Sequence, residues 1–196
     1  MIKLIIFDLD GTLTKPYLDF AVIRRALGIT NSDTLVLDHM LSLPSPEREK
    51  AFETVERFEA EAAENAQLRP GALDVVNRLR AGGKLVAINT RNSARSVDIV
   101  SRKFGIETDA AITRESPFPP KPDPAAIEDL LCRLGVSRSE AIMVGDFSVD
   151  VEAGKRAGLR TVLLTGDDPR TRNAGPDALI DNLSELLPLV EKWDGS

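Results

Sequence analysis

The chain has 196 residues, which suits one domain with at most a small insertion. Its net charge of −6 gives no basic footprint for a nucleic-acid polymer, and a single cysteine, Cys132, excludes an internal disulfide framework. With one histidine, His39, a zinc site or a histidine-based catalytic triad is not expected. No signal peptide and no apolar stretch of about 20 residues is present, so we expect a cytoplasmic protein that does not enter a membrane.

The first stretch of the chain combines a buried strand with acidic side chains. Residues 2–7 form a short apolar run that is typical of a strand inside a parallel sheet. Asp8 and Asp10 follow at once, and positions i and i+2 of an extended strand point to the same face. Gly11 then allows a sharp turn. Asp10-Gly11 is ordinary turn chemistry, but carboxylates at the end of a buried strand also predict a site that holds a cation.

Residues 15–68 interrupt the α/β pattern and are predicted to be helical. Asp19 is the expected N-cap of a short helix over residues 20–27, and a second helix is expected over residues 32–41. His39 lies in this second helix and is expected to be a structural or surface residue. We interpret residues 15–68 as a small all-helical cap inserted after the first strand, with an interaction bundle as the alternative.

A long charged helix is predicted over residues 47–67. Pro44-Ser45-Pro46 before it would provide a stop, an N-cap and a proline at the first helical position. The predicted apolar stripe of this helix consists of Phe52, Val55, Phe58 and Ala62.

From residue 69 onward, apolar strands alternate with amphipathic helices. The expected strands cover residues 85–90, 109–112, 141–145, 161–164 and 178–180, and the expected helices cover residues 72–80, 93–104, 124–134, 149–157 and 183–192. This alternation predicts right-handed β-α-β units. The fold class is therefore α/β, with a Rossmann-like three-layer core and a parallel sheet built from residues 1–14 and 69–196.

Polar side chains recur where the predicted strands end. Besides the two early aspartates they are Thr90, Lys121, Asp146 and Asp150. Each has an ordinary explanation by itself, such as a helix start, a surface lysine or a capped turn. Because the carboxyl ends of parallel strands lie at one edge of a sheet, their common placement favours a single shared site.

Four segments together resemble the signature motifs of the haloacid dehalogenase-like (HAD) hydrolases. They are Asp8-Leu-Asp10-Gly-Thr, Thr90 after its strand, Lys121-Pro-Asp-Pro and Gly145-Asp146-x-x-x-Asp150. The insertion point of the helical segment is similar to that of the small cap in the phosphoglycolate-phosphatase-like branch of this family.

This resemblance implies a Mg²⁺-dependent phosphatase that hydrolyses a small phosphorylated metabolite through an aspartyl-phosphate. Phosphoglycolate-like compounds, sugar phosphates and nucleotides are all compatible with it. Asp8 corresponds to the nucleophile and Asp10 to the general acid and base. The implied phosphate-binding residues are Thr90, Arg91 and Lys121, and the implied metal-binding residues are Asp8, Asp10 through its main-chain carbonyl, Asp146 and Asp150.

Other activities on the same core are less favoured by the residues present. Dehalogenases of the family lack an acid two residues after the nucleophile, where this chain has Asp10. Sugar phosphomutases usually carry a histidine soon after the first motif, where this chain has Lys15-Pro-Tyr-Leu. A catalytically silent binding protein would be expected to have lost an acid or Lys121. Lys15, Arg91 and residues of the expected cap near Tyr17 are the candidate contacts to the leaving group. The protein is expected to be a monomer or a homodimer.

Overall fold

A parallel sheet forms the centre of the molecule. The computed structural model describes residues 1–31, 34–165 and 175–195. Within these residues, six parallel strands lie in the order β3-β2-β1-β4-β5-β6. The strands are β1 (Leu4–Phe7), β2 (Leu85–Asn89), β3 (Ala110–Ile112), β4 (Ala141–Gly145), β5 (Arg160–Leu164) and β6 (Ala178–Ile180). The predicted α/β class and parallel Rossmann-like sheet are confirmed.

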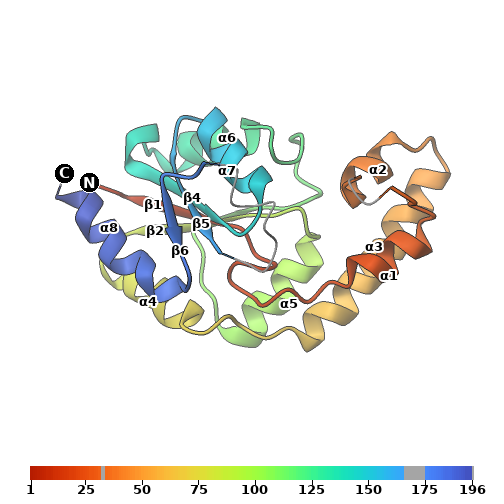
Figure 1. Cartoon of the computed structure of the whole chain (residues 1–196), viewed down its shortest axis with the longest axis horizontal. Helices are drawn as coiled ribbons and strands as arrows, with labels where there is room; N and C mark the ends of the chain where they lie inside the picture. Colours follow the sequence, from red (N-terminus) through yellow and green to blue (C-terminus); the bar gives the residue numbers. More distant parts are fainter. Residues whose placement is uncertain (32–33, 166–174, 196) are drawn as a thin grey trace.

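Helices cover both faces of this sheet (Figure 1). They are α4 (Ala72–Ala81), α5 (Ala94–Phe104) and α8 (Leu186–Asp194) on one face and α6 (Ala125–Leu134) and α7 (Ser148–Arg156) on the other. Two short 3₁₀ helices, η1 (Arg138–Glu140) and η3 (Leu183–Glu185), also belong to this part of the fold. Ile5 and Phe7 of β1 pack in the cluster with α4, α5 and α8, while Leu4 and Ile6 pack with α6 and α7. A strand buried on both faces explains why β1 is apolar throughout.

Residues 15–68, here called the helical segment, lie between β1 and α4 and project from one end of the sheet (Figure 1). They contain α1 (Phe20–Ala26), α2 (Val36–Ser42) and α3 (Glu47–Asn65), which share a small apolar cluster of their own. The Asp19 carboxylate accepts hydrogen bonds from the backbone N–H groups of Ala21 and Val22, as expected of an N-cap. The second helix begins at Val36, later than predicted, and the expected start at residue 32 lies outside the described residues.

Helix α3 corrects two details of the sequence analysis. Its N-cap is Pro46, and the hydroxyl of Ser45 donates a hydrogen bond to the Glu49 carboxylate at 2.8 Å instead of capping the helix. The predicted apolar stripe is confirmed in part, because Val55 is buried and Phe52 and Phe58 are half-buried against the same apolar cluster, but the stripe is not the most buried row. The buried row is Ala51, Val55, Glu59 and Ala63. Ala51 and Val55 pack in the apolar cluster of the helical segment, while Ala63 packs in the main cluster of the core. The row also includes a carboxylate, which a search for apolar stripes does not select.

The end of the chain returns to the core. Trp193 of α8 packs against the main apolar cluster, and the guanidinium of Arg160 lies 5.2 Å from its ring centre. Cys132 is exposed on α6. In the part of the chain that the structure describes, no helix combines the length and the apolar character needed to cross a bilayer.

Candidate active site

The predicted site residues lie at the carboxyl edge of the sheet. Asp8 directly follows β1, Thr90 follows β2 and Asp146 follows β4. Phe7 is paired with Ile88 of β2 and with Val144 of β4, so the three strands end at nearly the same level. The strand order also reverses between β1 and β4, and such crevices are where open α/β sheets bind ligands.

The ammonium group of Lys121 joins three segments of this edge. It donates hydrogen bonds to Asp8 Oδ1 at 2.7 Å, to Asp150 Oδ1 at 2.5 Å and to the carbonyl oxygen of Asn89 at 2.7 Å. These bonds use all three donors of an ammonium group. Burial alone would lower the pKa of Lys121, but the charges of Asp150 and Asp8 raise it above its ordinary value. Lys121 is therefore a fixed buried cation.

Carboxylates outnumber this cation. Asp8, Asp146 and Asp150 each offer an oxygen, and these oxygens all lie within 4.8 Å of one another. Burial raises the pKa of Asp8 to about 6, with Lys121 lowering it and Asp150 raising it further. Burial, followed by the charges of Asp8 and Asp150, raises the pKa of Asp146 to about 8. Uncompensated negative charge on clustered oxygens fits a divalent cation of the Mg²⁺ type, which prefers carboxylate ligands.

Two glycines allow the backbone to approach these acids. Gly11 has a φ of +89°, and a Cβ atom there would lie 2.2 Å from Asp146 Oδ2. A Cβ atom on Gly145 would lie 2.3 Å from the side chain of Asp150. The turn expected at Gly11 thus has a second requirement besides its backbone conformation, since the Asp146 carboxylate occupies the space of a side chain. That carboxylate is held by the Thr12 hydroxyl, which donates to Asp146 Oδ1 at 2.9 Å.

Asp10 lies in the same cavity as Asp8 but has different partners. Its Oδ1 accepts a hydrogen bond from the backbone N–H of Tyr17 at 2.9 Å. Burial raises the pKa of Asp10 to about 7, although the Tyr17 N–H lowers it in part. A carboxyl group with a pKa near neutrality can both release and take up a proton at physiological pH.

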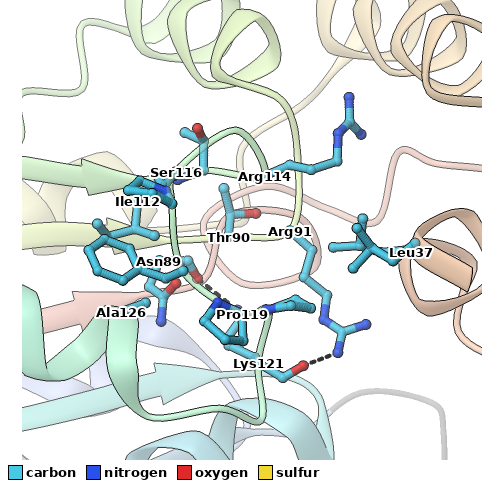
Figure 2. A pocket seen from close by; sticks show the side chains of 15 residues that line it. Leu37, Asn89, Thr90, Arg91, Ile112, Arg114, Ser116, Pro119, Lys121 and Ala126 are labelled. Carbon is cyan, nitrogen blue, oxygen red and sulfur yellow. Dashed lines mark hydrogen bonds between the residues drawn. The ribbon is translucent and has the colours of Figure 1, made fainter. Parts of the chain in front are cut away.

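The loop after β2 carries Thr90 and Arg91. The hydroxyl oxygen of Thr90 accepts a hydrogen bond from the N–H of Asn92 at 3.2 Å, and the Asn92 amide in turn donates to the hydroxyl of Tyr17 at 2.7 Å. Figure 2 shows Arg91 extending from Thr90 past Leu37 of α2 to the main-chain carbonyl of Lys121, to which its guanidinium donates. Arg91 also pairs with Asp38 of α2 at 3.4 Å, so its side chain already has protein partners.

A buried ion pair that the sequence analysis missed connects α3 to the core. Glu59 of α3 accepts a hydrogen bond from Arg114 Nη1 at 2.5 Å, and both side chains are 4% exposed. Its other oxygen accepts from the N–H of Ser93 at 3.2 Å, at the start of α5. The Arg114 guanidinium also lies 5.4 Å from the ring centre of Phe52. The available signal was Glu59 itself, a carboxylate in an i, i+4 row of apolar residues, while nothing in the sequence marked Arg114.

A cavity of about 480 Å³ opens over the clustered acids. Its lining includes Asp8, Asp10, Thr90, Arg91, Lys121, Asp146 and Asp150, and thus every predicted catalytic, phosphate-binding and metal-binding residue. Leu18 and Phe20, close to Tyr17 in the chain, also line the cavity. Lys15 is not among the described lining residues, and its ammonium group donates instead to Gln67 at 3.0 Å. A smaller cavity of about 260 Å³ lies beside the first, between the loop after β2 and the proline-rich loop before α6 (Figure 2).

Comparisons with known proteins agree with this geometry. A family model described as haloacid dehalogenase-like hydrolase matches residues 2–158, a range that contains all four motifs. The chain belongs to the HAD-like hydrolases. It is 31% identical to a haloacid dehalogenase-like hydrolase domain-containing protein of Arabidopsis thaliana, over 95% of this chain and 83% of the relative. It is 30% identical to a phosphoglycolate phosphatase of Vibrio parahaemolyticus, over 96% of both chains.

The fold of this HAD-like hydrolase also has solved counterparts. The crystal structure of a predicted phosphoglycolate phosphatase from Haemophilus somnus superposes with a TM-score of 0.78, covering 96% of this chain and 98% of that one. At 23% identity this likeness bears on the fold alone. The helical segment is part of the similarity, because almost the whole length of each chain is covered.

The buried ion pair predicts that substitutions at different positions of α3 destabilise the protein to different extents. Glu59→Ala should lower the free energy of unfolding by about 3–5 kcal/mol, because the Arg114 guanidinium stays buried without its partner. Urea denaturation measures the loss. The matched control is Glu56→Ala on the same helix, which removes a half-exposed pair with Arg95 at 3.9 Å and should cost less than about 1 kcal/mol. Equal losses in the two variants would contradict the structural role of Glu59.

The raised carboxyl pKa values predict how the metal-free protein responds to pH. Asp8, Asp10 and Asp146 have pKa values of about 6, 7 and 8 against an ordinary 3.8, so the folded protein keeps protons that the unfolded chain has released. The free energy of unfolding should therefore fall as pH rises through this range, by about 4 kcal/mol between pH 6 and pH 8 when the three groups are added together. Thermal unfolding with EDTA at the two pH values measures it.

Magnesium should reverse this loss. Saturating MgCl₂ is expected to raise the melting temperature more at pH 8 than at pH 6, because the cation binds the ionised carboxylates. Asp146→Asn is the control, since it keeps an acceptor for Thr12 and removes one titrating group. A magnesium effect that is equal at both pH values, or unchanged in Asp146→Asn, would argue against a cation site at this cluster.

Proposed function

We propose that this HAD-family phosphatase hydrolyses small phosphomonoesters in the cytoplasm with the help of Mg²⁺. The observation that carries the proposal is the Lys121 ammonium, which holds Asp8 at 2.7 Å and Asp150 at 2.5 Å inside the cavity that Asp10 also lines. A nucleophile, a titratable acid and a fixed cation in one cavity are what phosphoryl transfer requires. The relative in Vibrio parahaemolyticus that is called a phosphoglycolate phosphatase supports the reaction class.

Asp8 is the proposed nucleophile. Its carboxylate oxygen would form a new bond to phosphorus while the bond from phosphorus to the leaving oxygen breaks, which gives an aspartyl-phosphate. Lys121 orients the Asp8 carboxylate and compensates part of the negative charge that two approaching anions bring together. Thr90 and Arg91, at the end of β2, would hold the phosphoryl oxygens together with backbone N–H groups of both loops.

Asp10 is the proposed general acid and base. With a pKa of about 7 it is partly protonated at neutral pH and can give its proton to the leaving oxygen. The resulting carboxylate can then take a proton from the water that attacks the aspartyl-phosphate, which restores both aspartates. The hydrogen bond from the Tyr17 N–H fixes the carboxyl group during both steps.

Asp8, Asp146 and the main-chain carbonyl of Asp10 would hold the magnesium ion, and Asp150 would position Lys121 and the metal site. When bound, Mg²⁺ would supply positive charge that reduces repulsion between nucleophile and substrate. The clustering of carboxylate oxygens within 4.8 Å supports this assignment, as does the raised pKa of Asp146.

We further propose that two parts of the chain have different roles. Residues 1–14 and 69–196 would form the hydrolase core, and the helical segment, residues 15–68, would act as a cap. In support, the helical segment has its own apolar cluster and contributes residues of α1, α2 and α3 to the wall of the cavity opposite the aspartates. Such a cover excludes bulk water from the reaction and favours small substrates over phosphoproteins.

Asp8→Asn should abolish turnover. An amide is a poor nucleophile, so phosphate release from a panel of small phosphorylated metabolites with Mg²⁺ should fall by more than about a thousandfold. The variant keeps an oxygen that can accept from Lys121, and circular dichroism should show an unchanged fold. Substantial remaining activity in Asp8→Asn would remove the nucleophile assignment.

Asp10→Asn should separate the two chemical steps. Steady-state kcat should drop by about 10²–10⁴-fold, because attacking water loses its base. With p-nitrophenyl phosphate, whose leaving group needs little protonation, the first step should survive, giving a burst of nitrophenolate equal to the enzyme concentration before slow turnover. Stopped-flow absorbance measures the burst. Steady-state rates close to those of the unmodified enzyme would exclude the acid and base role.

A further inference from the structure

We infer that the preferred substrates are phosphomonoesters with an apolar leaving group, alkyl or aryl, which binds the wall of the cavity formed by the helical segment. This inference rests on the proposed phosphatase function and concerns the part of the substrate beyond the phosphoryl group. It follows from the side chains of the wall, from their exposure and from the partners of the nearby cations.

The two sides of the 480 Å³ cavity differ in chemistry. One side carries the aspartates, Lys121 and Thr90. The facing wall is largely apolar and comes from the helical segment and its connections: Leu18, Phe20, Ile23, Leu35, Val36, Leu37, Met40 and Val55. Phe147 and Val149 extend this apolar lining on the core. A phosphoryl group bound at Asp8 would therefore direct its leaving group between apolar surfaces.

Part of this wall is free to contact a ligand. Ile23, Met40 and Val55 are nearly fully buried in the apolar cluster of the helical segment, and their packing there explains their type. Phe20 is different, because it is 48% exposed while it lines the cavity. Leu18 and Leu35 are only partly buried. These three side chains retain apolar surface that a ligand can remove from water, a favourable change.

Cations of the described lining already have partners. Arg114 is paired with Glu59, Lys121 with Asp8 and Asp150, and Arg91 with Asp38. Arg24 donates a hydrogen bond to the carbonyl oxygen of Asn31 at 2.9 Å. A carboxylate or a second phosphate on the leaving group would have to displace one of these partners. An apolar leaving group meets no such competition.

The size of the cavity also favours a leaving group larger than two carbon atoms. A volume of about 480 Å³ lies within the range of pockets that take a drug-sized ligand. The phosphoryl group and a two-carbon leaving group fill only a small part of that space. A longer chain or a ring would reach more of the apolar lining, including Phe20 and Leu35, and would bury surface that these side chains expose.

The test is a series of n-alkyl monophosphates from ethyl to hexyl, measured with Mg²⁺ beside phosphoglycolate and acetyl phosphate. We expect kcat/KM to rise by about three- to fourfold for each added methylene group, the factor for transferring one methylene from water to an apolar site. Hexyl phosphate should exceed phosphoglycolate. Acetyl phosphate reports the phosphatase reaction itself, because its small activated leaving group needs no apolar wall.

A pair of variants on α1 locates the effect. Phe20→Ser should lower the ratio of kcat/KM for hexyl phosphate to that for acetyl phosphate by about fivefold, because part of the apolar wall is lost. Val22→Ser is the matched control. Val22 is 39% exposed on the same helix and is not among the lining residues of the cavity, so its substitution should leave the ratio unchanged.

The outcomes separate the two proposals. Hydrolysis of acetyl phosphate that depends on Asp8, combined with a flat alkyl series or a preference for phosphoglycolate over hexyl phosphate, would overturn the apolar leaving group and keep the phosphatase. An equal effect of Phe20→Ser and Val22→Ser would overturn the assignment of the wall. Failure to hydrolyse acetyl phosphate and every ester would overturn the phosphatase proposal and the inference with it.

Discussion

The site depends on one buried ammonium group. Without Lys121, the carboxylates of Asp8 and Asp150 would face each other and Asp146 across a few ångströms with no opposite charge among the described side chains that contact them. The electrostatic repulsion among these carboxylates would exceed the stabilisation from packing at the strand ends, because like charges repel strongly where water is excluded. The third hydrogen bond, to the Asn89 carbonyl, ties the same ammonium to β2. Lys121 therefore fixes the relative positions of the ends of β1 and β2 and the start of α7. The three carboxylates still outnumber this cation, and their excess negative charge favours a metal cation.

The parallel sheet explains how residues far apart in sequence reach this ammonium. Each strand ends at the same edge, and the pairing of Phe7 with Ile88 and Val144 sets the residues after these strands at one level. Every acid of the site then needs only to follow its strand closely. For this reason the sequence could predict the sheet and the gathering of Asp8, Thr90 and Asp146, each of which directly follows a strand. Apolar runs identify buried strands, and polar residues placed directly after such runs have few structural reasons to be there.

The helical segment could be predicted less well because its details depend on contacts with the core. The long helix was expected from its charged sequence, but its buried row was not. That row contains Glu59, whose carboxylate is buried because it pairs with Arg114, 55 residues further along the chain. A hydrophobic pattern predicts that a carboxylate such as Glu59 is exposed, and sequence spacing does not identify Arg114 as its partner. Lys15 was predicted to contact the leaving group because it lies close to the first motif. In the structure its ammonium group donates to Gln67 on the surface and does not line the cavity.

The contacts that hold the helical segment to the core differ in strength. Helix α3 is attached through the buried pair of Glu59 with Arg114, and the Lys103 ammonium of α5 donates to the carbonyl oxygens of Glu64 and Ala66 at its end. Helix α2 reaches the core through Asp38, which is half-exposed and lies 3.4 Å from Arg91. Partly exposed pairs of this kind contribute about 1 kcal/mol or less, while breaking a buried pair costs several times as much. Since most of the apolar wall comes from α1 and α2, the surface that faces the aspartates is carried by the more weakly attached part of the segment. A substrate that covers this wall gains binding energy there without disturbing the buried joint at α3.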